Sequence, residues 1–329
     1  MVTAFSAILG QERAMGLLRR YAAADGKAAG FLFHGEEGIG KEMAARAFAE
    51  ALICREPGDD GACGHCRDCM LLAGGGHPSL FFVTRPEDKA SIPIDSIRSL
   101  WEELSLKAFS DRPRVILFLP ADDLQLPAAN ALLKTLEEPP PNTHLLLVAH
   151  RLSKVPATIL SRCQKIPFSP LSPDIVERIL LASGEIEGKY PEEALRTAVA
   201  CSGGSPGRAL AMLSAGDENR KDWLRLLYKF DPAATFKFTD LWKKAEERDD
   251  AFAVPLSLLR DLLLLSSGAN GVIMNQDLLG ELDSVARRKP ASAWARAMKM
   301  LLETSRMPPK QFQRRLAIES LIFRSHGKE

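Results

Sequence analysis

The 329-residue chain lacks the features that would place it in a membrane, outside the cell or on nucleic acid by charge alone. Its longest apolar runs fall far short of the roughly 20 residues needed to cross a bilayer. The first residues, MVTAFSAILGQERA, have no basic segment followed by an apolar core, as a secretory signal has. The formal net charge is +1, so no overall basic field attracts DNA or RNA. We therefore expect a cytoplasmic protein with no membrane contact.

Internal repeats and low-complexity segments are also missing, so the chain is not expected to be a solenoid or a disordered linker. The apolar share of 46% is ordinary for a globular protein. Single hydrophobic cores stop growing near about 250–300 residues. The length therefore predicts two or three domains.

Short apolar segments alternate with helical patterns over the first half of the chain. Strands are expected at 30–34, 79–84, 114–119, 144–149 and 164–168. Their apolar character on both faces predicts a parallel sheet covered by helices on both sides. After residue 168 the amphipathic patterns predict only helices. The chain is thus divided into an α/β domain at 1–168, a small helical domain at 169–215 and a larger helical domain at 216–329.

Four of the six cysteines lie close together in the pattern C-x8-C-x2-C-x2-C: Cys54, Cys63, Cys66 and Cys69. Thiolates suit Zn²⁺, and four of them close a tetrahedral site with no open position for catalysis. His65 and His77 are nearby alternative ligands, and a set of free thiols is the other interpretation. Disulfides are rare in reducing cytosol. We therefore expect a structural zinc ion, held by the four cysteines in a module inserted at about residues 54–75.

The segment GEEGIGKE at 35–42 is close to a phosphate-binding loop, which reads G-x-x-x-x-G-K-[ST]. Gly35, Gly40 and Lys41 are in place, Gly38 is a further glycine of the candidate loop, and the segment follows an expected strand and opens an expected helix. Glu42 occupies the position of the Ser or Thr that would hold Mg²⁺, and it adds a negative charge beside the phosphates. The sequence therefore predicts a degenerate loop that does not support hydrolysis. The alternative is a glycine-rich turn kept only for its shape.

A second part of an ATPase site is also missing. Hydrolysing enzymes of this kind end an apolar strand with acidic residues that hold Mg²⁺ and orient water. Here the strand RVILFL ends at Leu119, followed by Pro120. Asp122 and Asp123 lie further along and are expected to form a helix cap or a solvated turn. The strand end therefore supplies neither the metal-binding acid nor the catalytic glutamate.

Arg162 in TILSRCQKIPF precedes the last expected strand. On composition alone, a surface arginine that ends a helix is the favoured interpretation, because its charge suits the C-terminal end of the helix dipole. The other interpretation is an arginine that faces a binding partner.

Several motifs in order carry a resemblance to a known family: LGQERA at 9–14, the degenerate loop, the four-cysteine insert, HPSLFFV at 77–83, AANALLKTLEEPPP at 128–141 and TILSRCQ at 158–164. Together they resemble the delta-prime subunits of bacterial DNA polymerase III clamp loaders, which belong to the AAA+ superfamily. The match covers most of residues 1–210. It weakens in the helical C-terminal third, where RDLLLL at 260–265 and RLAIESL at 315–321 are still suggestive.

The resemblance implies a RecA-like AAA+ domain, a helical lid and an all-α collar that oligomerises. It implies a DNA-replication subunit of the polymerase holoenzyme without ATPase activity of its own, and it leaves open whether ATP binds at all. The implied partners are the motor subunits gamma/tau and the delta subunit, with the sliding clamp and primed DNA reached through the complex. Arg162 would act in trans as an arginine finger on ATP held by a neighbouring motor subunit, and Arg208 would be a sensor-2-like residue.

Two alternative functions would each require residues that this sequence lacks. An ATP-hydrolysing motor subunit of the same clamp loader would need the Ser or Thr and the acids that are missing here. A zinc-containing nucleic-acid-binding protein would need a basic face with interleaved aromatic residues. The segment REPGDDGACGHCRDC is instead mixed in charge and contains no aromatic residue.

Overall fold

The computed structural model describes residues 2–23, 30–86, 89, 91–106, 111–184, 186, 189–215, 217–228, 252–269, 273–306, 319, 320 and 322. Two compact units follow one another along the chain, Met1–Ile175 and Val176–Glu329. The boundaries after residues 168 and 215 that the sequence suggests remain predictions.

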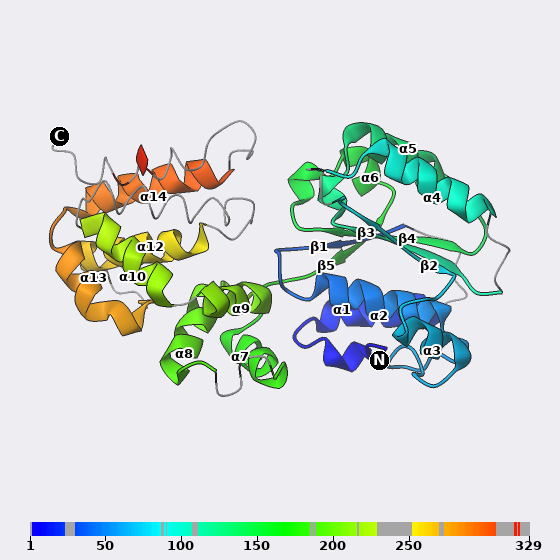
Figure 1. The fold of residues 1–329 in the computed structure, drawn as a ribbon, viewed down its shortest axis with the longest axis horizontal. Coiled ribbons are helices and arrows are strands. Elements are labelled where there is room, and N and C mark those ends of the chain that lie inside the picture. Colours follow the sequence, from blue (N-terminus) through cyan, green and yellow to red (C-terminus); the bar gives the residue numbers. More distant parts are fainter. Residues whose placement is uncertain are drawn as a thin grey trace. The chain divides into compact units, whose positions relative to one another are not determined.

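The first unit contains a five-stranded parallel sheet (Figure 1). Its strands lie in the order β2-β3-β4-β1-β5, with β1 at Gly30–His34, β2 at Leu80–Thr84, β3 at Arg114–Leu119, β4 at Thr143–Ala149 and β5 at Gln164–Pro167. In the middle of the sheet Phe33 pairs with Val148 on one side and Ile166 on the other. All five expected strands are present, each within one residue of the predicted bounds. The predicted α/β class with a parallel sheet is confirmed.

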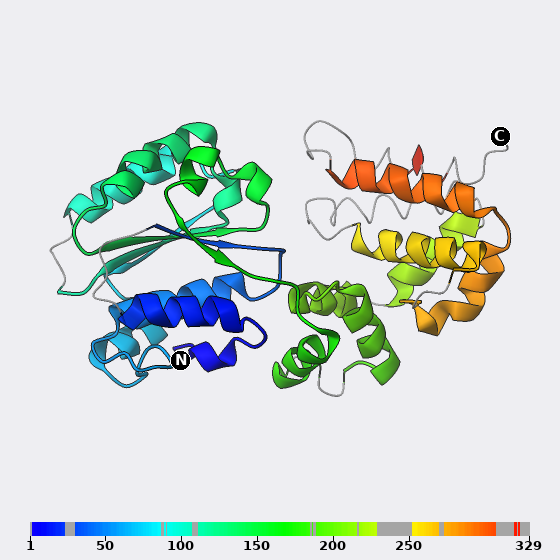
Figure 2. The same ribbon diagram turned by 180° about the vertical axis from the view of Figure 1, so that it is seen from behind.

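Helices cover both faces of this sheet, as Figures 1 and 2 show from opposite sides. One core contains Phe31 and Phe33 of β1, and the core on the opposite face contains Leu32, as the alternation of side chains along a strand requires. The first core is closed by η1 (Phe5–Ala7), α1 (Glu12–Ala23) and α2 (Lys41–Ile53). The second is closed by α4 (Ile94–Leu106), α5 (Leu126–Glu137) and α6 (Ala157–Leu160).

The short connecting elements place the residues of interest around the sheet. Helix α3 (Arg67–Ala73) lies in the cysteine segment, while η2 (Ala121–Asp123) and η3 (Leu152–Lys154) follow the ends of β3 and β4. Helix α5 has Pro127 in its first turn, where the missing backbone N–H does no harm, and it ends just before the proline run at 139–141. The end of α5 is therefore fixed by the sequence, close to the start of β4.

Beyond α7 (Pro173–Ala182), the described residues of the second unit are helical. Their elements are α8 (Glu192–Cys201), α9 (Pro206–Ala215), α10 (Asp217–Tyr228), α12 (Ala253–Ser267), η4 (Gln276–Leu278), α13 (Leu279–Ala286) and α14 (Ala291–Arg306). One hydrophobic core joins α10, α12, α13 and α14 around the buried Trp223 and Trp294. The helical character expected here is confirmed, although most of the segment 312–323 lies outside the described residues. No helix in the described ranges is long and apolar enough to span a bilayer.

Candidate functional site

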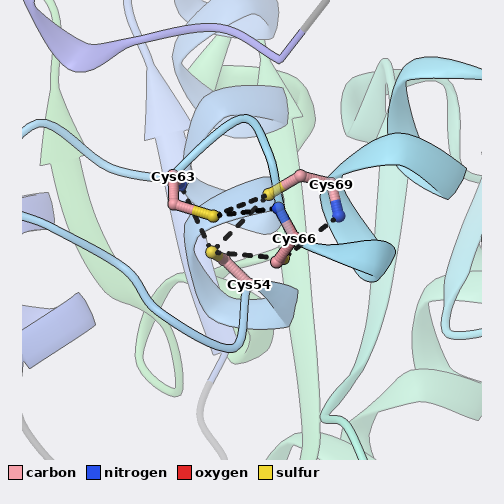
Figure 3. Close-up of side chains that lie close together, drawn as sticks. All are labelled: Cys54, Cys63, Cys66 and Cys69. Atoms are coloured by element: carbon pink, nitrogen blue, oxygen red, sulfur yellow. Dashed lines mark hydrogen bonds between the residues drawn. The ribbon is translucent and has the colours of Figure 1, made fainter.

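The four cysteine sulfurs converge on one point (Figure 3). Cys54 follows the last residue of α2, Cys63 lies in the following loop, Cys66 caps α3 and Cys69 lies in its first turn. The Sγ–Sγ separations are 3.9 Å for Cys54–Cys66, 3.8 Å for Cys63–Cys69 and 3.6 Å for Cys54–Cys69. Zinc–sulfur bonds of about 2.3 Å at tetrahedral angles require sulfurs about 3.8 Å apart. The four side chains thus match the shape of a tetrahedral metal site.

The surroundings of the sulfurs also suit bound thiolates. Backbone N–H groups donate to three sulfurs: Cys63 N to Cys54 at 3.3 Å, Cys66 N to Cys63 at 3.4 Å and Cys69 N to Cys66 at 3.4 Å. Burial raises the pKa of Cys54 and of Cys69, so these inner thiols need a cation to ionise. At Cys66 burial also opposes ionisation, but backbone donors from Arg55 and Cys69 outweigh it and lower the pKa to about 6. This set of soft donors fits a metal ion.

The two histidines considered as alternative ligands lie outside the four-sulfur cluster. His77 is buried; its Nδ1 accepts from the backbone of Ser79 at 3.1 Å, and its Nε2 lies 3.3 Å from Asp68 Oδ1. Both ring nitrogens are therefore used within the protein. His65 lies near Cys63 and Glu56, and both His65 and Glu56 are exposed. The structure therefore favours the four cysteines as the metal ligands.

A buried carboxylate attaches the cysteine segment to the α/β core, which the sequence reasoning did not find. Asp68 accepts from Arg55 Nε at 2.8 Å and contacts His77. Burial opposes its ionisation, but the hydrogen bond from His77 and the charge of Arg55 lower the pKa of Asp68. Nearby, Arg112 donates to the carbonyl groups of Ile53 and Cys54 at the end of α2. The cysteine segment is therefore held to the sheet domain by contacts that do not involve a metal.

The N-terminal segment holds the other side of the cysteine segment. Phe5 is fully buried, and its backbone N–H donates to the carbonyl of Asp60 at 3.1 Å. The Asp60 carboxylate accepts from the backbone of Ser6 at 2.7 Å and lies 3.6 Å from Arg19 of α1. A Cβ added at Gly61 would lie 3.5 Å from the ring of Phe5, so the loop packs closely on this ring. Residues far apart in the sequence thus fix the segment from two sides.

The glycine-rich loop at 35–42, which resembles a phosphate-binding loop, has the strand–turn–helix setting that the motif requires. Gly35, Gly38 and Gly40 have φ values of +148°, +73° and +91°, which glycine adopts readily. A Cβ at Gly35 would lie 2.5 Å from the carbonyl oxygen of Phe168, so only glycine fits there. Lys41 is buried, and its ammonium donates to the carbonyl of Glu36 in the same loop. Burial lowers the pKa of Lys41 to about 8, against the opposing charges of Glu37, Asp122 and Glu36.

Glu42, at the motif position of the Ser or Thr, pairs with a neighbouring arginine. It is exposed, and its Oε1 accepts from Arg46 Nε at 2.9 Å and Nη2 at 2.8 Å, one turn further along α2. Arg46 in turn lies over the ring of Phe82, with its guanidinium carbon 4.6 Å from the ring centre. The Glu42 carboxylate is therefore paired with Arg46 on the exposed surface of α2.

The end of β3 carries no acid, as expected, but the expectation for Asp122 was wrong. Leu119 ends the strand, and Pro120 and Ala121 follow. Asp122 is buried rather than part of a solvated turn, and its Oδ1 accepts from the backbone N–H of His150 at 3.1 Å. It does not cap η2 with its side chain. A buried carboxylate therefore ties the end of β3 to the end of β4, close enough to Lys41 to affect its pKa.

Arg162 lies between α6 and β5, with a third of its side chain exposed. Its Nη1 donates to the carbonyl of Thr158 at 3.0 Å, as expected for an arginine that ends a helix. Its Nε donates to Glu137 Oε1 at 2.7 Å, and its Nη2 donates to the same oxygen. The sequence reasoning did not foresee this ion pair with the last residue of α5.

The comparisons with known proteins agree with these motifs. Residues 10–172 match the family model described as "DNA polymerase III, delta subunit". The delta-prime subunit of DNA polymerase III from Pseudomonas aeruginosa is 35% identical over 239 residues, which cover 70% of this chain and 68% of that protein. The delta-prime subunit from Bacillus subtilis is 30% identical over 275 residues, 82% of each chain. The chain belongs to the delta-prime family of DNA polymerase III.

This family membership confirms the resemblance that the motifs indicated. The delta-prime family is not the only part of the clamp loader that the chain resembles. The tau subunit from Bacillus subtilis is 29% identical over 210 residues, which cover 64% of this chain and 37% of that protein. The chain is therefore similar to two kinds of DNA polymerase III subunit, delta-prime and tau.

In this delta-prime family member, Arg208 lies in the first turn of α9 and reaches back to the turn between α8 and α9. Its backbone N–H donates to Ser205 Oγ at 3.1 Å, and its Nη1 donates to the carbonyl of Ser202 at 3.1 Å. A Cβ at Gly203, whose φ is +61°, would lie 3.2 Å from Nη1. The guanidinium therefore helps to close the turn, and a role as a sensor-2-like residue stays a prediction.

Proposed function

We propose that this chain is a non-hydrolysing delta-prime subunit of a DNA polymerase III clamp loader. It assembles with gamma/tau motor subunits and a delta subunit, in the cytoplasm, to load the sliding clamp on primed DNA. It supplies Arg162 in trans to ATP bound by the neighbouring motor subunit. Its cysteine segment carries a structural zinc ion.

The proposal that the chain does not hydrolyse ATP rests on the loop after β1 and is supported by the end of β3. The residue that should present a hydroxyl to Mg²⁺ is Glu42, and its carboxylate is paired with Arg46 on the exposed surface of α2. The end of β3 offers Leu119 and Pro120 where a metal-binding acid and a catalytic glutamate are needed. Asp122 is the nearest carboxylate along the chain, and it is already bonded to the backbone of His150. At the positions where a working site holds the metal ion and orients the attacking water, this chain has Glu42, Leu119 and Pro120.

The role of Arg162 rests on its chemistry and its position. An arginine side chain keeps its charge under all conditions that a protein survives, so it can face the negative charge that develops on a transferring phosphoryl group. Its guanidinium is partly exposed and follows a short helix at the edge strand β5. An arginine at such an edge can reach the nucleotide of a neighbouring subunit.

The zinc proposal rests on the spacing and softness of the four sulfurs. With four cysteines as ligands, a tetrahedral ion has no open position for water or substrate. The ion would supply charge that stabilises four thiolates and so fold a segment with few apolar residues of its own. Cys54 and Cys69 are fully buried and would hold the ion on the side of the domain core.

An ATPase assay of the purified chain tests the absence of hydrolysis. The wild type is expected to release no phosphate above the buffer blank, and Lys41→Ala should change nothing. Glu42→Thr should not create activity, because the end of β3 still lacks acids. Turnover by the wild type that Lys41→Ala abolishes would show instead that the chain is an ATP-hydrolysing motor subunit.

A further inference from the structure

The guanidinium of Arg162 is bonded on all three nitrogens within its own chain. Nε and Nη2 both donate to Oε1 of Glu137, and Nη1 donates to the carbonyl of Thr158 at 3.0 Å and to Ser161 Oγ at 3.3 Å. An arginine that reaches a phosphate in another subunit must give up at least part of this set. The partner that Arg162 releases decides how easily its side chain can extend toward a neighbouring subunit.

Glu137 is the partner that exchanges most readily. It is the last residue of α5, where a negative charge lies at the unfavourable end of the helix dipole. About half of its side chain is exposed, so water can solvate the carboxylate once the arginine leaves. Exposed ion pairs contribute little net stability and break easily. The carbonyl of Thr158, by contrast, belongs to the short helix α6 only four residues before the arginine, so this contact is local and can move with it.

We propose that Glu137 is a latch that holds Arg162 in a withdrawn, charge-neutralised position until a phosphate of the neighbouring subunit's nucleotide replaces the carboxylate. The inference rests on the proposed role of Arg162 in trans. Phosphate and carboxylate compete for the same face of the guanidinium, because both accept paired hydrogen bonds from its planar fork. While the pair with Glu137 is closed, the two charges cancel and the finger presents little net charge. Glu137 is therefore a positioning residue that sets the cost of extending the finger.

The test measures binding between the full chain and the motor subunit of the same organism, with either a non-hydrolysable ATP analogue or ADP present. Glu137→Gln keeps the shape and one acceptor but removes the charge. Glu138→Gln, which removes the neighbouring charge, is the matched control. We expect Glu137→Gln to tighten the analogue-bound complex by about two- to five-fold, the range for loss of an exposed ion pair. Binding with ADP should not change, and the gain should shrink as salt screens the pair.

A double-mutant cycle tests whether the effect of Glu137 on binding depends on Arg162. Glu137→Gln should have no effect when Arg162 is already alanine. Two results together would overturn the latch and keep the proposed role of Arg162. In the first, Glu137→Gln leaves the affinity of the analogue-bound complex unchanged or lowers it. In the second, Arg162→Ala removes the difference in affinity between the analogue-bound and ADP-bound complexes. A gain from Glu137→Gln that persists with alanine at 162 also overturns the latch. If Arg162→Ala leaves the difference between analogue and ADP intact, the proposed finger fails and the latch fails with it.

Discussion

Replacing Cys66 with serine tests whether the cysteine segment depends on a metal. Cys66 caps α3, its sulfur accepts from the backbone of Cys69, and it lies 3.9 Å from the sulfur of Cys54. A serine oxygen is a harder and shorter ligand that cannot complete the four-sulfur site. Structural zinc contributes an apparent binding free energy of about 10–16 kcal/mol in small modules. That exceeds what a short segment with few apolar residues can supply by packing, so residues 54–75 should lose their fixed structure.

The damage should stay local because the sheet domain has its own two cores. Two apolar side chains connect the first core of the sheet domain with the segment: Phe5, which packs on its loop at 1% exposure, and Leu72, which lies within it at 7%. Each buried side chain of this size contributes about 1.5–3 kcal/mol, so losing both lowers the free energy of unfolding by about 3–6 kcal/mol at most. The contacts of Asp68 and Arg112 lie on the inner side of the segment and limit the loss further.

Elemental analysis and hydrogen exchange provide the measurement. The wild type should contain one zinc ion per chain, and Cys66→Ser should contain none and exchange fast at residues 54–75, with β1, β3 and β4 still protected. Cys201→Ser, which changes a cysteine of α8 outside the cluster, should keep its zinc. A metal-free wild type with four titratable thiols in this segment would refute the reasoning.

Two further predictions concern the phosphate-binding loop. Because the pKa of Lys41 is about 8 in the folded chain and near 10.5 when unfolded, the unfolded state binds more protons between these values. Stability should therefore rise with pH from 8 to 10.5, and urea unfolding should show that this gain, up to about 3 kcal/mol, is absent in Lys41→Met. Gly35→Ala should cost about 1–3 kcal/mol or more in the same assay, because its Cβ meets the carbonyl of Phe168. Gly40→Ala, where the space is open, should cost less, and equal costs would contradict the close approach at Gly35.

The sequence predicts local elements well where chain chemistry alone decides them. Helix α2 begins directly after the loop glycines, as the sequence predicts, and a run of alanine and other helix-forming residues continues it to Ile53. Helix α5 is bracketed by Pro127 and the proline run. The four cysteines are close enough in sequence that their spacing alone predicts the cluster. These features depend on neighbours a few residues away.

Contacts between distant residues could not be predicted from this single sequence. The pairing of Phe5 with Asp60 and of Arg162 with Glu137 joins residues 55 and 25 positions apart, and hydrophobic periodicity carries no information about such pairs. Asp122 was misjudged because two adjacent aspartates after a proline suggest an exposed turn. In the structure the end of β4 lies beside this turn, and the backbone of His150 gives the buried carboxylate a donor.

The central claim is that this chain acts on ATP bound by another subunit. The most direct measurement is the ATPase and clamp-loading activity of a complex reconstituted with Arg162→Ala in this chain alone. An arginine finger contributes about 10³–10⁵-fold at the site it serves. We expect the adjacent motor site to lose most of its turnover, with clamp loading falling more than total ATPase because every site must fire to complete a cycle. Arg162→Lys should rescue poorly, since lysine lacks the planar fork. Wild-type ATPase and loading in the Arg162→Ala complex would contradict the account and leave Arg162 as an arginine that ends a helix.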